Sequence, residues 1–263
     1  MAELLAAQGA GVVVNGRDAD AASEAAQRIP GAVAFRGSPA DAAVADALID
    51  TCTREFGQID ILVNCAGTAG LASESILNVT SEQFRELLDA HLGTVFETCR
   101  AAAPKMIAHG GGSIVNTSSF AFLGDYGGTG YPAGKGGVNG LTLAIAAELK
   151  EHGVRANVVC PGAKTRLSTG QDYEAHIVQL HRRGLLDEVS MRAALDAPPP
   201  EYVAPTYAYL VSDVARDVTG QIFIAAGGFV GRFDRQTPAV LGYRDHHDAP
   251  PWSVEEIRAM MTR

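Results

Sequence analysis

The sequence predicts an α/β fold, a doubly wound parallel sheet with helices on both of its faces. The first observation is length, since 263 residues are enough for one large domain. The second is composition: 47% apolar and 19% charged residues, with 29 glycines, are typical of a globular chain with many tight turns. The third is alternation, because short apolar runs are separated by helical patterns along most of the chain.

The predicted strands are short and almost continuously apolar, as parallel strands buried on both faces are. In chain order they are Val12–Asn15, Ala32–Phe35, Ile61–Asn64, Ser113–Thr117, Ala156–Cys160 and Ile222–Ala225.

Helices are predicted between these strands, at Asp20–Ile29, Asp41–Phe56, Ser81–Ala108, Tyr131–His152 and Tyr202–Ser212. Thr80 and Gln83 form a capping box at the start of the third of these helices.

The whole chain, 1–263, is interpreted as one domain with two additions. Residues 165–200 interrupt the alternation with helix-capable segments and end in three prolines, and we expect them to form a substrate lid. Residues 231–263 are expected to form a loop-like tail that ends in a short amphipathic helix.

Chemically active residues follow the predicted strands, which is where open α/β sheets bind ligands. Tyr131 and Lys135 are four residues apart, so they share one face of a helix. An ammonium that close should lower the pKa of the tyrosine, which could then exchange a proton with an alcohol or ketone oxygen. Ser118 and Ser119 end the strand that precedes this helix.

Composition argues against several other classes of protein. The net charge is −9 and no basic run exceeds Arg182-Arg183, so neither nucleic acid nor a membrane surface is an expected partner. The four cysteines have no C-x-x-C spacing and no apolar run is long enough for a membrane span, which favours a cytoplasmic protein. No metal is expected, because the histidines, including His246 and His247, lack metal-ligand spacing.

Four ordered motifs resemble those of classical short-chain dehydrogenases/reductases. They are Asn64-Cys65-Ala66-Gly67, Ile114-Val115-Asn116-Thr117-Ser118-Ser119, Asn157-Val158-Val159-Cys160-Pro161-Gly162 followed by Thr165, and Thr219-Gly220-Gln221 with Gly227-Gly228. Tyr131 and Lys135 lie between the second and the third of these motifs. The resemblance implies a Rossmann-like fold, a small-molecule substrate, and a homodimer or homotetramer. It also implies that Ser119, Tyr131 and Lys135 are catalytic, and that the cofactor is bound by Asn64, Ala66, Gly67, Tyr131, Lys135, Pro161, Gly162 and Thr165.

The C-terminal third is also similar to the dehydrogenase part of peroxisomal multifunctional enzymes and their bacterial relatives. The similar strings are Glu201-Tyr202-Val203-Ala204-Pro205 and Gly227-Gly228-Phe229-Val230-Gly231. This narrower resemblance implies 3-hydroxyacyl-CoA thioesters or steroid alcohols as substrates, and NAD as cofactor.

The chain departs from the family pattern at its beginning. The family's first strand and its T-G-x-x-x-G-x-G phosphate loop have no counterpart, and Met1–Gln8 resembles the second half of the helix that follows that loop. We therefore expect a start codon upstream of Met1, or else a fragment or a pseudoenzyme. The absent strand should leave two neighbouring strands unpaired in the sheet.

Two further departures concern candidate catalytic residues. His91 stands where the family usually has an asparagine, as it does in the multifunctional enzymes, and it could relay protons or simply pack. The family spacing from serine to tyrosine would select Ser118, whereas the direction of side chains along the strand selects Ser119, which we prefer.

The function predicted from these residues is hydride transfer between nicotinamide and a secondary alcohol or ketone. Gly16 has no carboxylate that could bind the ribose 2′-hydroxyl of NAD(H), and Arg17 could bind the 2′-phosphate of NADP(H). These two residues slightly favour NADP(H) over NAD(H). The alternative is a catalytically silent subunit or binding protein of the same fold. Apolar residues and arginines of the segment 165–200 would suit an apolar substrate with an anionic group at one end. They are Leu180, Leu185, Leu186, Met191, Arg182, Arg183 and Arg192.

Overall fold

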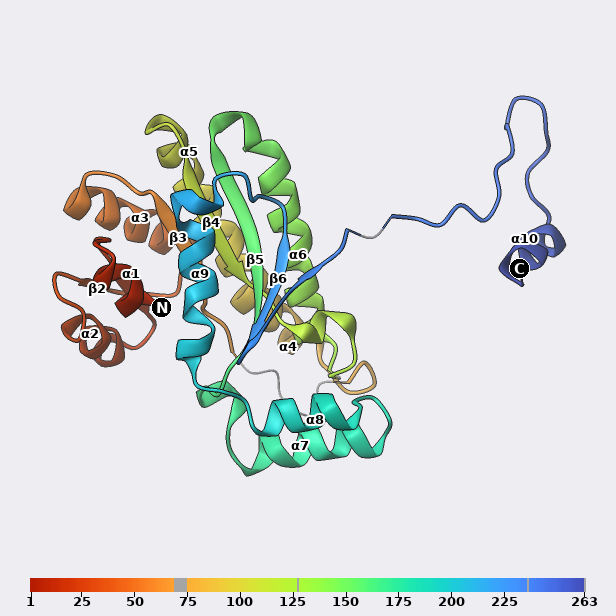
Figure 1. Cartoon of the computed structure of the whole chain (residues 1–263), viewed down its shortest axis with the longest axis horizontal. Coiled ribbons are helices and arrows are strands. Elements are labelled where there is room, and N and C mark those ends of the chain that lie inside the picture. Colours follow the sequence, from red (N-terminus) through yellow and green to blue (C-terminus); the bar gives the residue numbers. More distant parts are fainter. Residues whose placement is uncertain (69–74, 127, 236, 263) are drawn as a thin grey trace. The chain divides into compact units, whose positions relative to one another are not determined.

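The computed structural model, shown in Figure 1, describes residues 1–68, 75–126, 128–235 and 237–262. The chain divides into two compact units, Met1–Phe233 and Asp234–Arg263. The first unit is an α/β domain that contains every strand of the described chain. The second contains a loop and one helix, α10 (Val254–Met261), which begins with a capping box between Ser253 and Glu256.

The strands of the first unit form two sheets. Their bounds are β1 (Val13–Gly16), β2 (Val33–Arg36), β3 (Ile61–Asn64), β4 (Gly112–Thr117), β5 (Val154–Gly162), β6 (Ile222–Ala226) and β7 (Phe229–Phe233). β1 and β2 pair with each other, and the larger sheet has the order β3-β4-β5-β6-β7. β3 to β6 are parallel, as predicted, and β7 runs antiparallel to β6.

The structure corrects two features of the predicted sheet. β7 was missed because it follows the tight turn at Gly227 (φ 56°), and it carries no long apolar run. The single predicted sheet is divided, since β1 and β3 are not paired with each other in the described residues. The division falls where the sequence analysis expects two strands to lack a common neighbour.

The helices follow the predicted order with small shifts at their ends. Their bounds are α1 (Ala2–Ala7), α2 (Ala19–Gln27), α3 (Ala42–Phe56), α4 (Ser81–Leu88), α5 (Thr94–Ala108), α6 (Gly130–Glu148), α7 (Gln171–Arg182), α8 (Glu188–Leu195) and α9 (Ala204–Val211). The predicted capping box of Thr80 and Gln83 is present at the start of α4. The predicted helix 81–108 is interrupted by a π-helical turn, Asp89–Gly93, which separates α4 from α5.

Both faces of the large sheet are covered, because alternate residues of each strand point to opposite sides. Ile114 of β4 packs with Val95 and Val138, which come from α5 and α6. Its neighbour Val115 packs on the other side with Tyr207 and Leu210 of α9. The prediction of a Rossmann-like sheet with helices on both faces is therefore confirmed.

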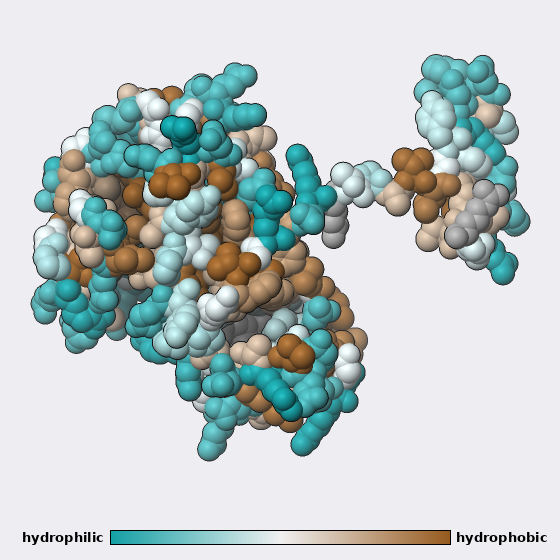
Figure 2. All heavy atoms as spheres, in the orientation of Figure 1, coloured by the Kyte–Doolittle hydropathy of each residue, from teal (hydrophilic) through white to brown (hydrophobic). Residues whose placement is uncertain are grey.

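The insert at residues 165–200 forms the helical pair α7 and α8, with a small core of its own. Ile177, Leu180 and Leu186 are buried there. Figure 2 shows that hydrophobic residues reach the surface of the first unit in several places among more hydrophilic ones. Within the described ranges, none of the helices combines the length and apolarity that a bilayer crossing requires.

Candidate active site

Helix α6 places Tyr131 and Lys135 on the same face, one turn apart. The Lys135 Nζ lies 5.8 Å from the centre of the Tyr131 ring. Lys135 is 4% exposed, and its ammonium donates a hydrogen bond of 2.9 Å to the carbonyl oxygen of Thr117 at the end of β4. Burial lowers the pKa of Lys135 to about 8, so most of these side chains still carry a positive charge at neutral pH.

The two serines after β4 have different surroundings. The Ser118 hydroxyl is buried and donates to the Lys135 carbonyl oxygen at 3.0 Å. Ser119 begins the short 3-10 helix Phe120–Leu123, where its Oγ accepts a hydrogen bond from the Ala121 amide at 3.2 Å. The Ser119 hydroxyl also interacts with the phenol of Tyr131, whose pKa it lowers. Ser119 is thus the serine that the structure brings to Tyr131.

The net shift of the Tyr131 pKa is upward, and its largest cause is burial of the phenol. The expectation that Lys135 would lower this pKa is wrong for this arrangement, because desolvation of the phenolate outweighs the favourable interactions around it. Tyr131 is consequently protonated at neutral pH.

His91 lies in the π-helical turn between α4 and α5 and is 1% exposed. Its ring meets the Tyr131 ring edge to face, with 4.9 Å between the centroids and 87° between the planes. Neither ring nitrogen has a hydrogen-bond partner of ordinary geometry among the described residues. Burial, followed by the charge of Lys135, lowers the His91 pKa to about 4, and the Thr68 backbone opposes this only in part. His91 is therefore a neutral packing partner of Tyr131 in this state.

Gly67 and Gly162 are predicted cofactor residues that lie in tight spaces. A Cβ atom on Gly67 would be 2.9 Å from Cε1 of His91 and 3.7 Å from Nζ of Lys135, so the backbone after β3 passes close to these two side chains. At the end of β5, Gly162 lies against Ala226, where a Cβ atom would be 2.7 Å away. At both positions the backbone packs so closely against other parts of the protein that a larger residue would force them to shift.

The remaining predicted cofactor residues lie in different surroundings. Ala66 lies after β3 and next to Gly67, and Pro161 lies near the end of β5 and next to Gly162. Thr165 caps the 3-10 helix Arg166–Ser168. The Asn64 side chain points into the core, where it donates to Asn116 Oδ1 at 2.9 Å and accepts from Thr98 Oγ1 at 2.9 Å. Arg17 is exposed and follows β1, in the two-stranded sheet rather than in the catalytic cluster.

Thr117 is a residue of the site that was not predicted from the sequence. Its carbonyl oxygen holds the Lys135 ammonium, while its hydroxyl lies 2.8 Å from the Tyr207 hydroxyl and donates to Cys65 Sγ at 3.3 Å. The only signal in the sequence was the position of Thr117 at the end of a strand that precedes two serines.

The predicted apolar residues of the insert differ in exposure: Leu185 is 39% exposed, and Met191 is partly buried. Leu180 and Leu186 are 1% and 4% exposed, so they stabilise the insert and are unavailable to a substrate. Tyr173 of α7 lies close enough to Tyr126 and Tyr131 for both of them to raise its pKa, although burial is the larger cause. Tyr126 and Tyr173 pack against the same small core.

Comparison with known proteins identifies the family. A family model described as enoyl-(acyl carrier protein) reductase matches residues 1–230. A 3alpha-hydroxysteroid dehydrogenase of Mediterraneibacter gnavus is 37% identical over 188 residues, which are 71% of each chain. A cyclohexanol dehydrogenase of Acinetobacter sp. (strain SE19) is 34% identical over 234 residues, 87% of this chain and 88% of the relative.

A solved structure gives the same result. The crystal structure of a short chain dehydrogenase from Mycobacterium avium superposes with a TM-score of 0.80 at 31% sequence identity, covering 99% of this chain and 88% of that one. The chain therefore belongs to the short-chain dehydrogenase/reductase family, whose members are oxidoreductases that exchange a hydride between a nicotinamide cofactor and an alcohol or ketone.

Proposed function

We propose that this protein reduces a ketone, or oxidises the corresponding secondary alcohol, on an apolar cyclic substrate such as a steroid. The observation that carries the proposal is the cluster of Ser119, Tyr131 and Lys135, which places a hydroxyl, a phenol and a buried ammonium around one point. A catalytically silent protein of this fold would have no need to bury a lysine charge there, because an unpaired buried charge costs stability.

The three side chains divide the proton chemistry between them. Tyr131 donates its proton to the substrate oxygen during reduction and recovers it during oxidation. The Ser119 hydroxyl donates a hydrogen bond to the same oxygen and stabilises the negative charge that develops on it. The Lys135 ammonium favours the phenolate that remains after transfer. A bound nicotinamide supplies or accepts the hydride.

The surroundings of Lys135 fit the nicotinamide half of such a cofactor. The Lys135 ammonium could donate to ribose hydroxyls, and Gly67 lies close to it, since a Cβ atom there would be 3.7 Å from Nζ. Thr165, at the edge of the insert, would face the carboxamide. NADP(H) is slightly favoured, because Gly16 offers no carboxylate to a ribose 2′-hydroxyl and the exposed Arg17 could pair with a 2′-phosphate.

A cyclic substrate is supported by the walls of the site and by the relatives. Tyr173 of the insert lies near Tyr131, and flat aromatic surfaces pack well against rings. Two similar proteins are named for hydroxysteroid and cyclohexanol oxidation. A 3-hydroxyacyl thioester is the second candidate, favoured by exposed Arg182 and Arg183, which could bind its anionic end.

Activity assays at the nicotinamide absorbance band test the proposal. The panel contains a hydroxysteroid, cyclohexanol, a 3-hydroxyacyl-CoA and a sugar alcohol, each with NAD and NADP. We expect turnover with the first two and its loss in Tyr131→Phe, while cofactor binding by this variant stays near that of the wild type. Turnover that survives in Tyr131→Phe would contradict the mechanism. Cofactor binding without turnover of any substrate would favour the silent protein.

We also propose that the protein forms a homodimer or homotetramer in the cytoplasm. A hollow of about 420 Å³ lies between α4, α5 and α6 and is lined mainly by apolar side chains, among them Leu92, Phe96 and Leu141. Phe96 is 48% exposed in a single chain. The cytoplasm is supported by four free cysteines. Light scattering of wild type and Phe96→Asp tests assembly, and a monomeric wild type would contradict it.

A further inference from the structure

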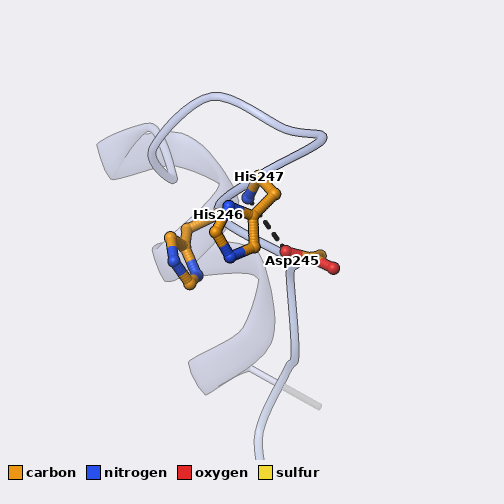
Figure 3. A group of neighbouring side chains, drawn as sticks. All are labelled: Asp245, His246 and His247. Carbon is orange, nitrogen blue, oxygen red and sulfur yellow. Dashed lines mark hydrogen bonds between the residues drawn. The ribbon is translucent and has the colours of Figure 1, made fainter.

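We propose that Asp245, His246 and His247 bind a divalent transition-metal ion of the zinc class. The three residues belong to the unit Asp234–Arg263, so the inference is independent of the proposed function. One ligand atom from each side chain lies within 4.8 Å of the others, and all three side chains are exposed. Figure 3 shows them on the loop that precedes α10.

The donor set suits zinc and its neighbours in the transition series. Two imidazoles and one carboxylate are common ligands of Zn²⁺, and open positions are then filled by water. Donors around a tetrahedral zinc ion are about 3.3 Å apart, given bonds of about 2.0 Å. The side chains must therefore move inward by a further ångström or so. Their exposure leaves them free to do so, and the two rings already lie 4.0 Å apart at their centroids.

Hydrogen bonds hold the backbone of this loop in place. The His247 amide donates to Asp245 Oδ1 at 2.9 Å, the interaction drawn as a dashed line in Figure 3. The Asp245 carbonyl oxygen accepts from the amides of Asp248 and Ala249 at 3.3 and 3.1 Å. The first bond orients the carboxylate and leaves Oδ2 for an ion, much as outer hydrogen bonds orient ligands in known metal sites.

The neighbouring Arg244 carries a positive charge, which is engaged away from the proposed ion. Its guanidinium donates to Glu256 at 2.6 Å and to the carbonyl oxygens of Pro250 and Pro251, and it stacks on Trp252 at 3.7 Å. The pair lowers the pKa of Glu256 to about 2, so this carboxylate is ionised and balances the arginine. The same contacts fasten the loop to the start of α10.

The spacing of these residues explains why the sequence analysis expected no metal there. Known helical or hairpin sites use ligands several residues apart, whereas these three are consecutive. Consecutive residues converge only if the backbone turns sharply between them, and Asp245–Ala249 makes such a turn. His152 provides a matched control, since it is also exposed but stands alone in a 3-10 turn.

Titration of the full chain with ZnCl₂ in a calorimeter, and with CoCl₂ followed by visible absorption, tests the proposal. The variants are His246→Ala, His247→Ala, Asp245→Asn and the control His152→Ala. Asp245→Asn keeps an acceptor for the His247 amide but removes the anionic ligand. We expect one ion per chain with a Kd of roughly 10 μM. Each ligand variant should weaken binding at least about 10-fold, whereas His152→Ala should bind as the wild type does.

Competing sites can be separated by spectroscopy. The half-exposed Cys52 and exposed Cys65 could also take up metal. Thiolate ligation would add a charge-transfer band to the cobalt spectrum, whereas the proposed site would show visible d–d bands alone. The proposal is overturned if the double variant His246→Ala/His247→Ala binds zinc as tightly as the wild type, or if the wild type does not bind below about 1 mM.

Discussion

Gly67 is the position where a single methyl group should test the packing of the catalytic cluster. In Gly67→Ala the new Cβ would lie 2.9 Å from Cε1 and 3.0 Å from Nδ1 of His91. Ordinary contacts between such atoms are about 3.5–4.0 Å, so the overlap is about 0.5 Å or more with each atom.

The His91 ring has little room to move away from that methyl group. It is 1% exposed, its Cβ lies 3.1 Å from where a Cβ on Gly134 would stand, and its ring lies against Tyr131. Overpacking of this kind typically costs 1–3 kcal/mol. We expect Gly67→Ala to lower the free energy of unfolding by about 2 kcal/mol, and the melting temperature by roughly 4–8 °C.

Urea unfolding followed by circular dichroism measures the effect. Gly136→Ala is the matched control in α6, because its Cβ would meet nothing within 4 Å. The control should be neutral or stabilise the helix by up to about 1 kcal/mol. A double-mutant cycle with His91→Ala isolates the clash, since removal of the ring makes space for the methyl group. The coupling should be about 1–2 kcal/mol in favour of the double variant.

Two results would refute this reasoning. If Gly67→Ala unfolds at the same urea concentration as the wild type, the backbone after β3 is not pressed against His91. If the loss of stability persists unchanged in the His91→Ala background, its cause is not the contact with the His91 ring.

Three more predictions concern the site. In steady-state assays, Ser119→Ala should lower kcat by about 10²–10³-fold and Ser118→Ala by much less, because Ser119 is the serine that interacts with the Tyr131 phenol. The reverse order would assign the hydrogen bond to the substrate to Ser118. Burial lowers the Lys135 pKa from its ordinary value of 10.5 to about 8 in the folded protein. The free energy of unfolding of the wild type should therefore rise between those pH values relative to Lys135→Met, because the unfolded chain binds the extra proton; parallel stability curves would exclude this titration. Arg17→Ala should weaken NADPH binding in fluorescence titrations and leave NADH unchanged, and equal effects on both would remove the basis for NADP(H).

Much of the fold was predictable because its signals are local. Ile61–Asn64 was predicted with its observed bounds, and the capping box of Thr80 and Gln83 marked the start of α4. β7 and the π-helical turn at His91 were not predicted. Both depend on how a segment pairs or packs with distant residues, and neither has a period that the sequence displays.

The sequence by itself determined the type of chemistry. Tyr131 and Lys135 share a helix face because of their spacing, and strand alternation separates the directions of Ser118 and Ser119. Only the tertiary structure decided the environment of these groups. Burial raises the Tyr131 pKa although a cation lies nearby, and the insert buries Leu180 within its own core. The spacing of residues along a helix or strand fixes the direction in which their side chains point. The desolvation that shifts a pKa depends on every element that covers the side chain, so it is set only when the whole domain has folded.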